Sequence, residues 1–96
     1  MGIQPIFEWD ERKRRANLRK HKLDFADCVA VFLGPMVTAV DRRRDYGETR
    51  FQTLGLLGNR VVAVAHTEEC GVIRVISMRK ASTYEEADYF EATFQD

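Results

Sequence analysis

Positively charged side chains mark the segments of this chain that could act on an anion. Arg74, Arg79 and Lys80 fall within one run of β-favouring residues, and Arg50 opens an earlier run. A local basic surface attracts phosphate even in a protein of zero net charge, because salt screens charges beyond about 8 Å. These four residues are the cations that a site on a sheet would use.

Strand geometry predicts that the two arginines lie on opposite faces of their strand, because side chains alternate with a period of two. By this count Arg74 shares one face with Ile76 and Met78. Arg79 shares the other face with Ile73, Val75 and Ser77. One of these faces must be covered by helices, so an arginine there lies at the rim or is paired with an acid.

His66 and Glu68 form the second candidate pair. They continue one face of a strand that carries Val62 and Val64, and they stand where a hairpin is expected to open to solvent. Histidine is the side chain best suited to proton transfer near neutral pH. The alternative is a structural histidine with its ring hydrogen-bonded, since buried polar groups are usually satisfied.

Metal and cofactor sites are not expected. The chain has two histidines, His21 and His66, and neither belongs to a ligand pair at helical or hairpin spacing. Its two cysteines, Cys28 and Cys70, lie far apart and outside any CxxC pattern, so we expect free, buried thiols.

Length and composition predict one domain spanning residues 1–96. The chain is 45% hydrophobic and 31% charged, as is typical of a soluble globular protein. No apolar run approaches the ~18 residues that span a bilayer, and no signal peptide is visible, so we expect a cytoplasmic protein that does not enter the membrane.

The zero net charge hides an asymmetry. Residues 1–50 carry 11 basic and 8 acidic side chains, whereas residues 51–96 carry 4 and 7. Seven of the basic residues lie between Arg12 and Lys22, with no acid among them. This run is either a solvated helix face or a surface for an anionic partner.

Helices are expected at both ends of the chain. Asp10 is an N-cap for a helix that runs to about Lys20, pinned mainly by its start, and Asp24 caps a second helix that ends at Gly34-Pro35. The apolar stripe of the second helix is Phe25, Val29 and Phe32. Thr83 and Glu86 form a capping box for the last helix, whose stripe is Ala87, Phe90 and Phe94.

The middle of the chain favours strands. Four segments rich in Val, Ile, Thr and Phe are bounded by turn residues: Met36–Asp41, Arg50–Leu57, Arg60–Thr67 and Val72–Lys80. Short connections predict that the last three form an antiparallel meander, and the charged segment 42–49 is a loop. The predicted fold is a two-layer α+β domain with an antiparallel sheet and the order ααββββα.

Several of these segments together resemble the BrnT family of toxins. The opening of that family is matched by Phe7-Glu8-Trp9-Asp10 with Lys13, Asn17 and Lys20-His21. Its second helix and central strand are matched by Phe25, Val31-Phe32, Arg50-Phe51 and Gly55. Its most recognisable stretch is matched by His66-Thr67-Glu68 and by residues 73–81.

This resemblance implies a RelE-like fold and a ribonuclease that arrests growth by cleaving RNA without a metal. It also implies a partner antitoxin of the BrnA type, through which the complex would bind operator DNA. Charge complementarity predicts that the antitoxin covers the basic surface with an acidic segment.

The same resemblance implies roles for particular residues. Arg74 and Arg79 would stabilise the charge that develops on the phosphoryl oxygens, and His66 or Glu68 would carry the proton. The side chains expected to hold the RNA are Lys80, Arg50, His21 and Lys20.

An alternative function stays open, because Glu69 and Cys70 stand where the family often has an arginine and a glycine. In this alternative the domain is a non-catalytic RelE-like module that binds an antitoxin and acts through transcriptional autoregulation. The two hypotheses differ in whether changes to Arg74 or Arg79 alter RNA cleavage.

Overall fold

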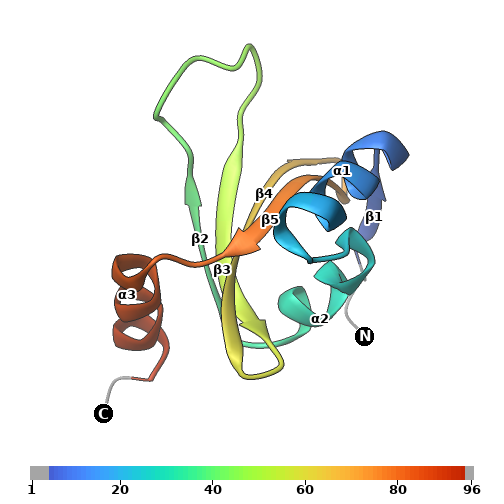
Figure 1. Cartoon of the computed structure of the whole chain (residues 1–96). Coiled ribbons are helices and arrows are strands. Elements are labelled where there is room, and N and C mark those ends of the chain that lie inside the picture. The colour runs from blue at the N-terminus through green and yellow to red at the C-terminus, as the bar shows by residue number, and fades with distance from the viewer. Residues whose placement is uncertain (1–4, 95–96) are drawn as a thin grey trace.

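A computed structural model describes residues 5–94 and shows a five-stranded mixed sheet with helices on both faces (Figure 1). The strands run in the order β1-β5-β4-β3-β2. In chain order the elements are β1 (Ile6–Trp9), α1 (Glu11–His21), a 3-10 turn (Phe25–Asp27), α2 (Cys28–Leu33), β2 (Met36–Val40), β3 (Phe51–Leu57), β4 (Arg60–Glu69), β5 (Val72–Lys80) and α3 (Thr83–Thr93). Within residues 5–94 no helix is both long and apolar enough to cross a membrane.

The α+β class is confirmed, but the predicted order ααββββα and the purely antiparallel sheet are wrong. The four-residue strand β1 precedes α1 and pairs in parallel with β5, from Ile6 opposite Val72 to Trp9 opposite Val75. Strands β2 to β5 form the antiparallel meander. β1 has no local partner, since its pairing joins residues more than sixty positions apart, and turn chemistry therefore gives no sign of it.

Helix α1 starts as predicted but is also held at its centre. Asp10 caps it, accepting hydrogen bonds from the backbone N–H groups of Arg12 (2.8 Å) and Lys13 (3.2 Å). Asn17 is buried; its Nδ2 donates to the Leu23 carbonyl, and its Oδ1 accepts from the Met78 backbone N–H, both at 3.0 Å. β1 pairs with β5 only as far as Val75, so beyond that residue the edge of β5 has no strand beside it. Asn17 accepts the hydrogen bond of the Met78 N–H on this edge, a donor that would otherwise be buried without a partner.

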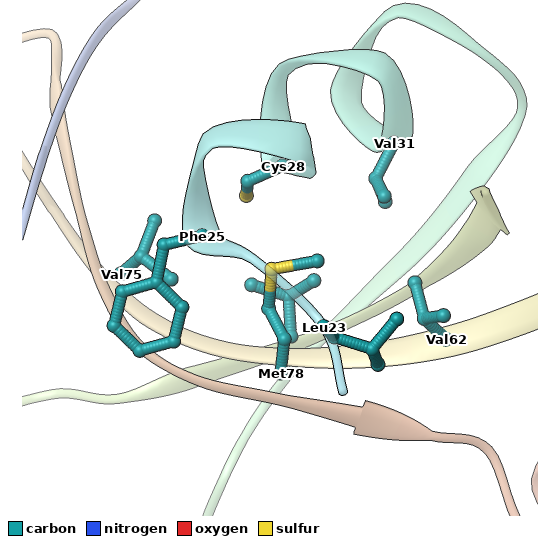
Figure 2. Close-up of a cluster of buried hydrophobic side chains, with 8 residues drawn as sticks. Leu23, Phe25, Cys28, Val31, Val62, Val75 and Met78 are labelled. Carbon is teal, nitrogen blue, oxygen red and sulfur yellow. The ribbon is translucent and has the colours of Figure 1, made fainter. Parts of the chain in front are cut away.

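The layer formed by α1, the 3-10 turn and α2 covers one face of the sheet, which we call the helix-covered face. Its buried core is shown in Figure 2 and comprises Leu23, Phe25, Cys28, Val31, Val62, Val64, Val75 and Met78. The predicted stripe is partly wrong, because Val29 is exposed and Cys28 and Val31 point inward. The 3-10 turn causes this change, since it rotates side chains by about 120° per residue instead of about 100°.

A close approach between α2 and β3 depends on Gly55. A Cβ at this position would lie 2.6 Å from Val31 Cγ1 and 3.3 Å from the Val31 carbonyl oxygen. Real Cβ atoms do not come this close, so the backbone of β3 can meet α2 only with glycine here.

Helix α3 packs on the opposite face, against β2 and β3. The capping box is Ser82 with Glu85, one residue earlier than predicted. Tyr89 is the fully buried residue of α3 and donates from its hydroxyl to the Pro35 carbonyl (2.8 Å), whereas Phe90 and Phe94 of the predicted stripe are exposed. The cysteine prediction is correct for Cys28, which is free and buried, and wrong for Cys70, which is free and exposed.

A bulge in β5 changes which residues share a face. Ala65 pairs with Ser77 but His66 pairs with Val75, so Ile76 is an extra residue. Val75 and Met78 therefore both enter the core of the helix-covered face. The prediction that Arg74 and Arg79 lie on opposite faces is wrong, because both lie on the face that carries α3.

Replacing Asn17 with Leu should destabilise the protein, since it leaves the Met78 N–H and the Leu23 carbonyl buried without partners. We expect a loss of about 2–4 kcal/mol in the free energy of unfolding, measured by urea denaturation. The control is Leu at the exposed neighbour Ala16, which should change stability by less than about 0.5 kcal/mol. Equal stability of the two variants would contradict this role for Asn17.

Candidate functional site

The face of the sheet that carries α3 is only partly covered. Toward β2 and β3 it holds the second core cluster: Leu54, Val61, Ala63, Ala81 and Tyr89. Beyond α3, side chains of β3, β4 and β5 reach the surface of the same face. We call this part the open face; its residues are Gln52, Ala65, Thr67, Arg74, Ser77 and Arg79, and pairing across the strands assigns them to one side.

Arg79 is held on the open face by Glu85 of α3. Its Nη1 and Nη2 donate to the two Glu85 carboxylate oxygens at 2.7 and 2.9 Å, a bidentate pair. Gln52 donates to the same carboxylate at 2.8 Å. The Arg79 side chain remains 35% exposed, so a ligand on the open face could contact it.

The pair shifts both groups toward their charged forms. The Arg79 guanidinium, together with the Ser82 N–H and Gln52, lowers the pKa of Glu85 to about 2. Glu85 raises the pKa of Arg79 in turn. Glu85 is therefore a fixed negative charge at neutral pH, and with such a low pKa it is a poor proton acceptor.

Arg74 belongs to a second ion-paired group. Its Nη2 donates to both oxygens of Glu48, each at 3.0 Å, and Arg50 Nε donates to the same carboxylate at 3.2 Å. The Arg50 guanidinium lies 4.2 Å from the centre of the Tyr46 ring, a cation–π contact. The Arg74 side chain is 45% exposed.

A groove of about 540 Å³ runs beside Arg74. It is lined by Glu8, Glu48, Thr49, Thr67, Glu68, Glu69, Cys70, Val72 and Arg74. Arg74 and Glu68, two of the predicted catalytic residues, therefore line one groove. Four carboxylates surround the single arginine, so the groove as it stands is acidic.

A second hollow, of about 420 Å³, lies between β2, the loop after it and α3. Arg42, Arg43, Gln52 and Glu85 are among its lining residues. Arg43 is paired with Asp41 at 2.8 Å. The hollow extends the open face toward the segment 42–49, which is a loop as predicted.

His66 is inside the protein. Its side chain is fully buried on the helix-covered face, and its ring contacts Phe32 edge-on and stacks with Phe51. Nε2 lies 2.7 Å from Thr53 Oγ1, while Nδ1 has no hydrogen-bond partner among the described residues. The expectation that His66 opens to solvent is wrong; its environment is that of the structural alternative.

Glu68 is the solvent-exposed neighbour of this histidine. Its Oε1 lies 3.7 Å from His66 Nδ1, and its side chain is 44% exposed. Burial lowers the pKa of His66, and the Glu68 charge opposes this effect in part. His66 is therefore neutral near pH 7, with its free nitrogen directed to a carboxylate at the surface.

The remaining predicted residues lie elsewhere. Lys80 is exposed and pairs with Val62, which places it at the helix-covered face. Lys20 and His21 are at the C-terminal end of α1, on that same side of the sheet. Of the predicted site residues, all of which lie within residues 5–94, only Arg74 and Arg79 share the open face. Among residues 5–94 no three His, Cys, Asp or Glu side chains converge as a metal site would require.

Sequence reasoning missed the acids and amides that accompany the arginines: Glu48, Gln52 and Glu85. Glu85 did carry a signal, because it is three residues after Ser82, the spacing of a capping box. Placing that box one residue late hid it. Glu48 meets Arg74, and Gln52 meets Glu85, only through pairing of distant strands and loops, which the spacing along the chain does not reveal.

Comparison with known proteins identifies the family. Residues 9–85 match the model described as "Ribonuclease toxin, BrnT, of type II toxin-antitoxin system", which is most of the chain. The chain belongs to the BrnT family. The predicted resemblance is thereby confirmed, and the matched region contains both arginines of the open face.

A solved structure supports the BrnT assignment. The crystal structure of the ribonuclease toxin BrnT of Brucella abortus, at 1.1 Å resolution, is 33% identical in sequence with a TM-score of 0.62. The alignment covers 84% of this chain and all of that one. No curated protein matches the chain in a sequence search.

The Arg79–Glu85 pair should make stability depend on acid. The pKa of Glu85 is about 2 in the folded protein and ordinarily 4.5, so its stabilisation is present above about pH 4.5 and is lost as the pH falls toward 2. Glu85→Gln keeps a residue that suits the capping box. It should lower the free energy of unfolding at pH 7 by about 1–2 kcal/mol, discounted because Arg79 is partly exposed.

The measurement is urea denaturation at several pH values. The difference between wild type and Glu85→Gln should shrink toward pH 2. Glu86→Gln, one residue further along α3, serves as the matched control and should leave the pH dependence as it is. A constant difference across this range would show that Glu85 does not act through its charge.

Proposed function

We propose that this protein is a metal-independent endoribonuclease toxin that arrests growth and is neutralised by a BrnA-type antitoxin. Membership of the BrnT family supports RNA cleavage and an antitoxin partner. The observation that carries the proposal is the presence of two partly exposed arginines, Arg74 and Arg79, on the open face of the sheet. This arrangement supplies positive charge to a phosphate from side chains alone.

In the proposed reaction the 2′-hydroxyl of one nucleotide attacks the adjacent phosphorus. The bond from phosphorus to the 5′-oxygen breaks and the leaving oxygen takes up a proton from water, so the products are a 2′,3′-cyclic phosphate and a 5′-hydroxyl. Negative charge grows on the phosphoryl oxygens in the transition state, and each preorganised cation there is worth about 3 kcal/mol. Arg79 and Arg74 fill this role, with the phosphate replacing Glu85 or Glu48 at the guanidinium.

We assign the proton transfer to Glu68 and give His66 a supporting role. Glu68 is exposed and projects from β4 on the helix-covered side with His66, but it also lines the groove beside Arg74, so it would take the proton of the attacking hydroxyl from across the end of the β4–β5 hairpin. His66 lies behind it at 3.7 Å and can stabilise the proton on the carboxylate or share it. As a buried residue His66 acts on Glu68 and does not contact RNA.

RNA outside the reacting phosphate would be held by basic side chains around the sheet. Arg50 is beside Arg74, in contact with Glu48 and Tyr46. Lys80, Lys20 and His21 would hold RNA that passes to the helix-covered side. Operator DNA would be bound only through the antitoxin.

A second candidate function is supported by the acids of the site. Each open-face arginine already has a carboxylate partner, and Glu69 adds negative charge to the groove. These charges favour a non-catalytic module that binds an antitoxin and acts through transcriptional autoregulation. Under this alternative, neither the wild-type protein nor a variant at Arg79 cleaves RNA.

Expression of the protein without an antitoxin should stop bacterial growth, and Arg79→Ala should relieve the arrest. Loss of one preorganised cation corresponds to about a 100-fold lower kcat for RNA cleavage. Arg60→Ala, at the exposed β3–β4 turn, removes a charge away from the open face and should remain toxic. Arg79→Ala also leaves the Glu85 carboxylate without its partner. The double variant Arg79→Ala with Glu85→Ala removes that carboxylate as well, and it should be as inactive as the single variant.

Purified wild-type protein should cleave RNA at an unchanged rate in an excess of EDTA, and it should leave 2′,3′-cyclic phosphate ends. Mass spectrometry of the fragments identifies these ends. Growth without arrest and RNA that stays intact at every salt concentration tested would refute the enzyme and leave the binding module.

A further inference from the structure

We infer that the outer surface of α1 is a binding site for the backbone of RNA, separate from the open face. This inference deepens the proposed function, because it names a second surface that the same substrate would use. It rests on three arginines that none of the roles above involves: Arg12, Arg15 and Arg19.

The three arginines lie on the side of α1 that points away from the sheet. Asn17 is buried and faces β5, so the side of α1 that points away from the sheet is fixed. At about 100° per residue, Arg12, Arg15 and Arg19 lie roughly 140–160° around the helix from Asn17. They form one row along the outside of α1, with axial steps of about 4.5 and 6 Å between neighbours.

The three arginines also present positive charge to solvent. All three arginines are exposed, and no salt bridge of theirs is found in the described part of the chain. Arg14, by contrast, is tied to Glu11 and Asp24 at the edge of the helix. The arginines of the row keep their donors available. Planar guanidinium groups suit bidentate contacts to phosphate.

The chemistry of this surface suits RNA better than a protein partner. Stable protein interfaces need apolar or aromatic anchors that become buried at their centre. The outward side of α1 offers none, since its exposed apolar residues are only Ala16 and Leu18, both on the flanks of the row. A surface of arginines without an apolar centre suits a phosphodiester backbone, where affinity comes mainly from charge.

The two surfaces lie on different sides of the sheet. α1 packs on the helix-covered face and α3 on the other (Figure 1). A strand of about 30 nucleotides, at about 3.4 Å per nucleotide, exceeds the 39 Å longest extent of the molecule. Such an RNA can pass from the open face around the edge of the sheet to α1.

The test measures the affinity for a single-stranded RNA of about 30 nucleotides by fluorescence anisotropy over a range of salt concentrations. The RNA carries 2′-O-methyl groups, so it cannot be cleaved by attack of its own hydroxyl. Each phosphate contact contributes about 0.7 to the slope of log Kd against log salt for a single strand. Replacing Arg12, Arg15 and Arg19 together with Gln should therefore reduce the slope by about 2.

Matched single variants sharpen the test. Arg15→Gln should reduce the slope by about 0.7, whereas Arg60→Gln, which removes one exposed charge at the β3–β4 turn, should leave it unchanged. Replacement of the row by three lysines should preserve the slope. Gln has nearly the helix propensity of Arg, so the variants should keep the fold, which circular dichroism checks.

Cleavage assays separate this inference from the proposed function. The triple Gln variant should raise KM for a long RNA and leave kcat unchanged, since the row contacts substrate and transition state equally. If wild type fails to cleave RNA but the slope falls as expected, the enzyme is refuted and the binding surface stands. An unchanged slope in the triple variant overturns the inference. The inference is also overturned if the triple variant binds the RNA as wild type does and loses affinity only for duplex DNA or for a polyglutamate peptide.

Discussion

The bulge at Ile76 of β5 determines the layout of this protein. One extra residue between Val75 and Ser77 lets Val75 and Met78 enter the same core, although they are three positions apart. The same extra residue brings Arg74 and Arg79 to one face. Without it, one arginine would point into the helical layer, where its charge would be buried. Asn17 binds the Met78 N–H two residues after the bulge and so holds the altered register in place.

Charge pairing on the open face has two consequences. Bidentate contact with Glu85 orients the Arg79 guanidinium and attaches α3 to the sheet. It also means that a phosphate must compete with a carboxylate, as it must with Glu48 at Arg74. A dianionic transition state carries more charge than the ground-state phosphate, so this competition favours the transition state over bound substrate. The pairs of Arg79 with Glu85 and of Arg74 with Glu48 thus explain how a protein of no net charge can hold arginines that suit phosphate.

Much of the fold could be predicted from the sequence, and the exceptions share a cause. Asp10 as an N-cap, the four central strands and the loop 42–49 depend on neighbours in the chain, and local patterns predict them. The strand β1, the bulge in β5 and the side of α3 that faces inward depend on distant segments. A period-two count cannot detect an inserted residue, so it assigned Arg74 and Arg79 to different faces. For the site, residue types indicated the arginines, whereas Glu48, Gln52 and Glu85 became evident only from the structure.

The central claim is that Arg74 and Arg79 contact the same RNA on the open face, and NMR of the arginine side-chain Nε–H signals tests it most directly. During titration with 2′-O-methyl RNA, the Nε–H signals of Arg74 and Arg79 should both shift, and they should do so with one common Kd. If RNA binds and both of these signals stay in place while only those of α1 move, the open face is not where the substrate binds and the account is wrong.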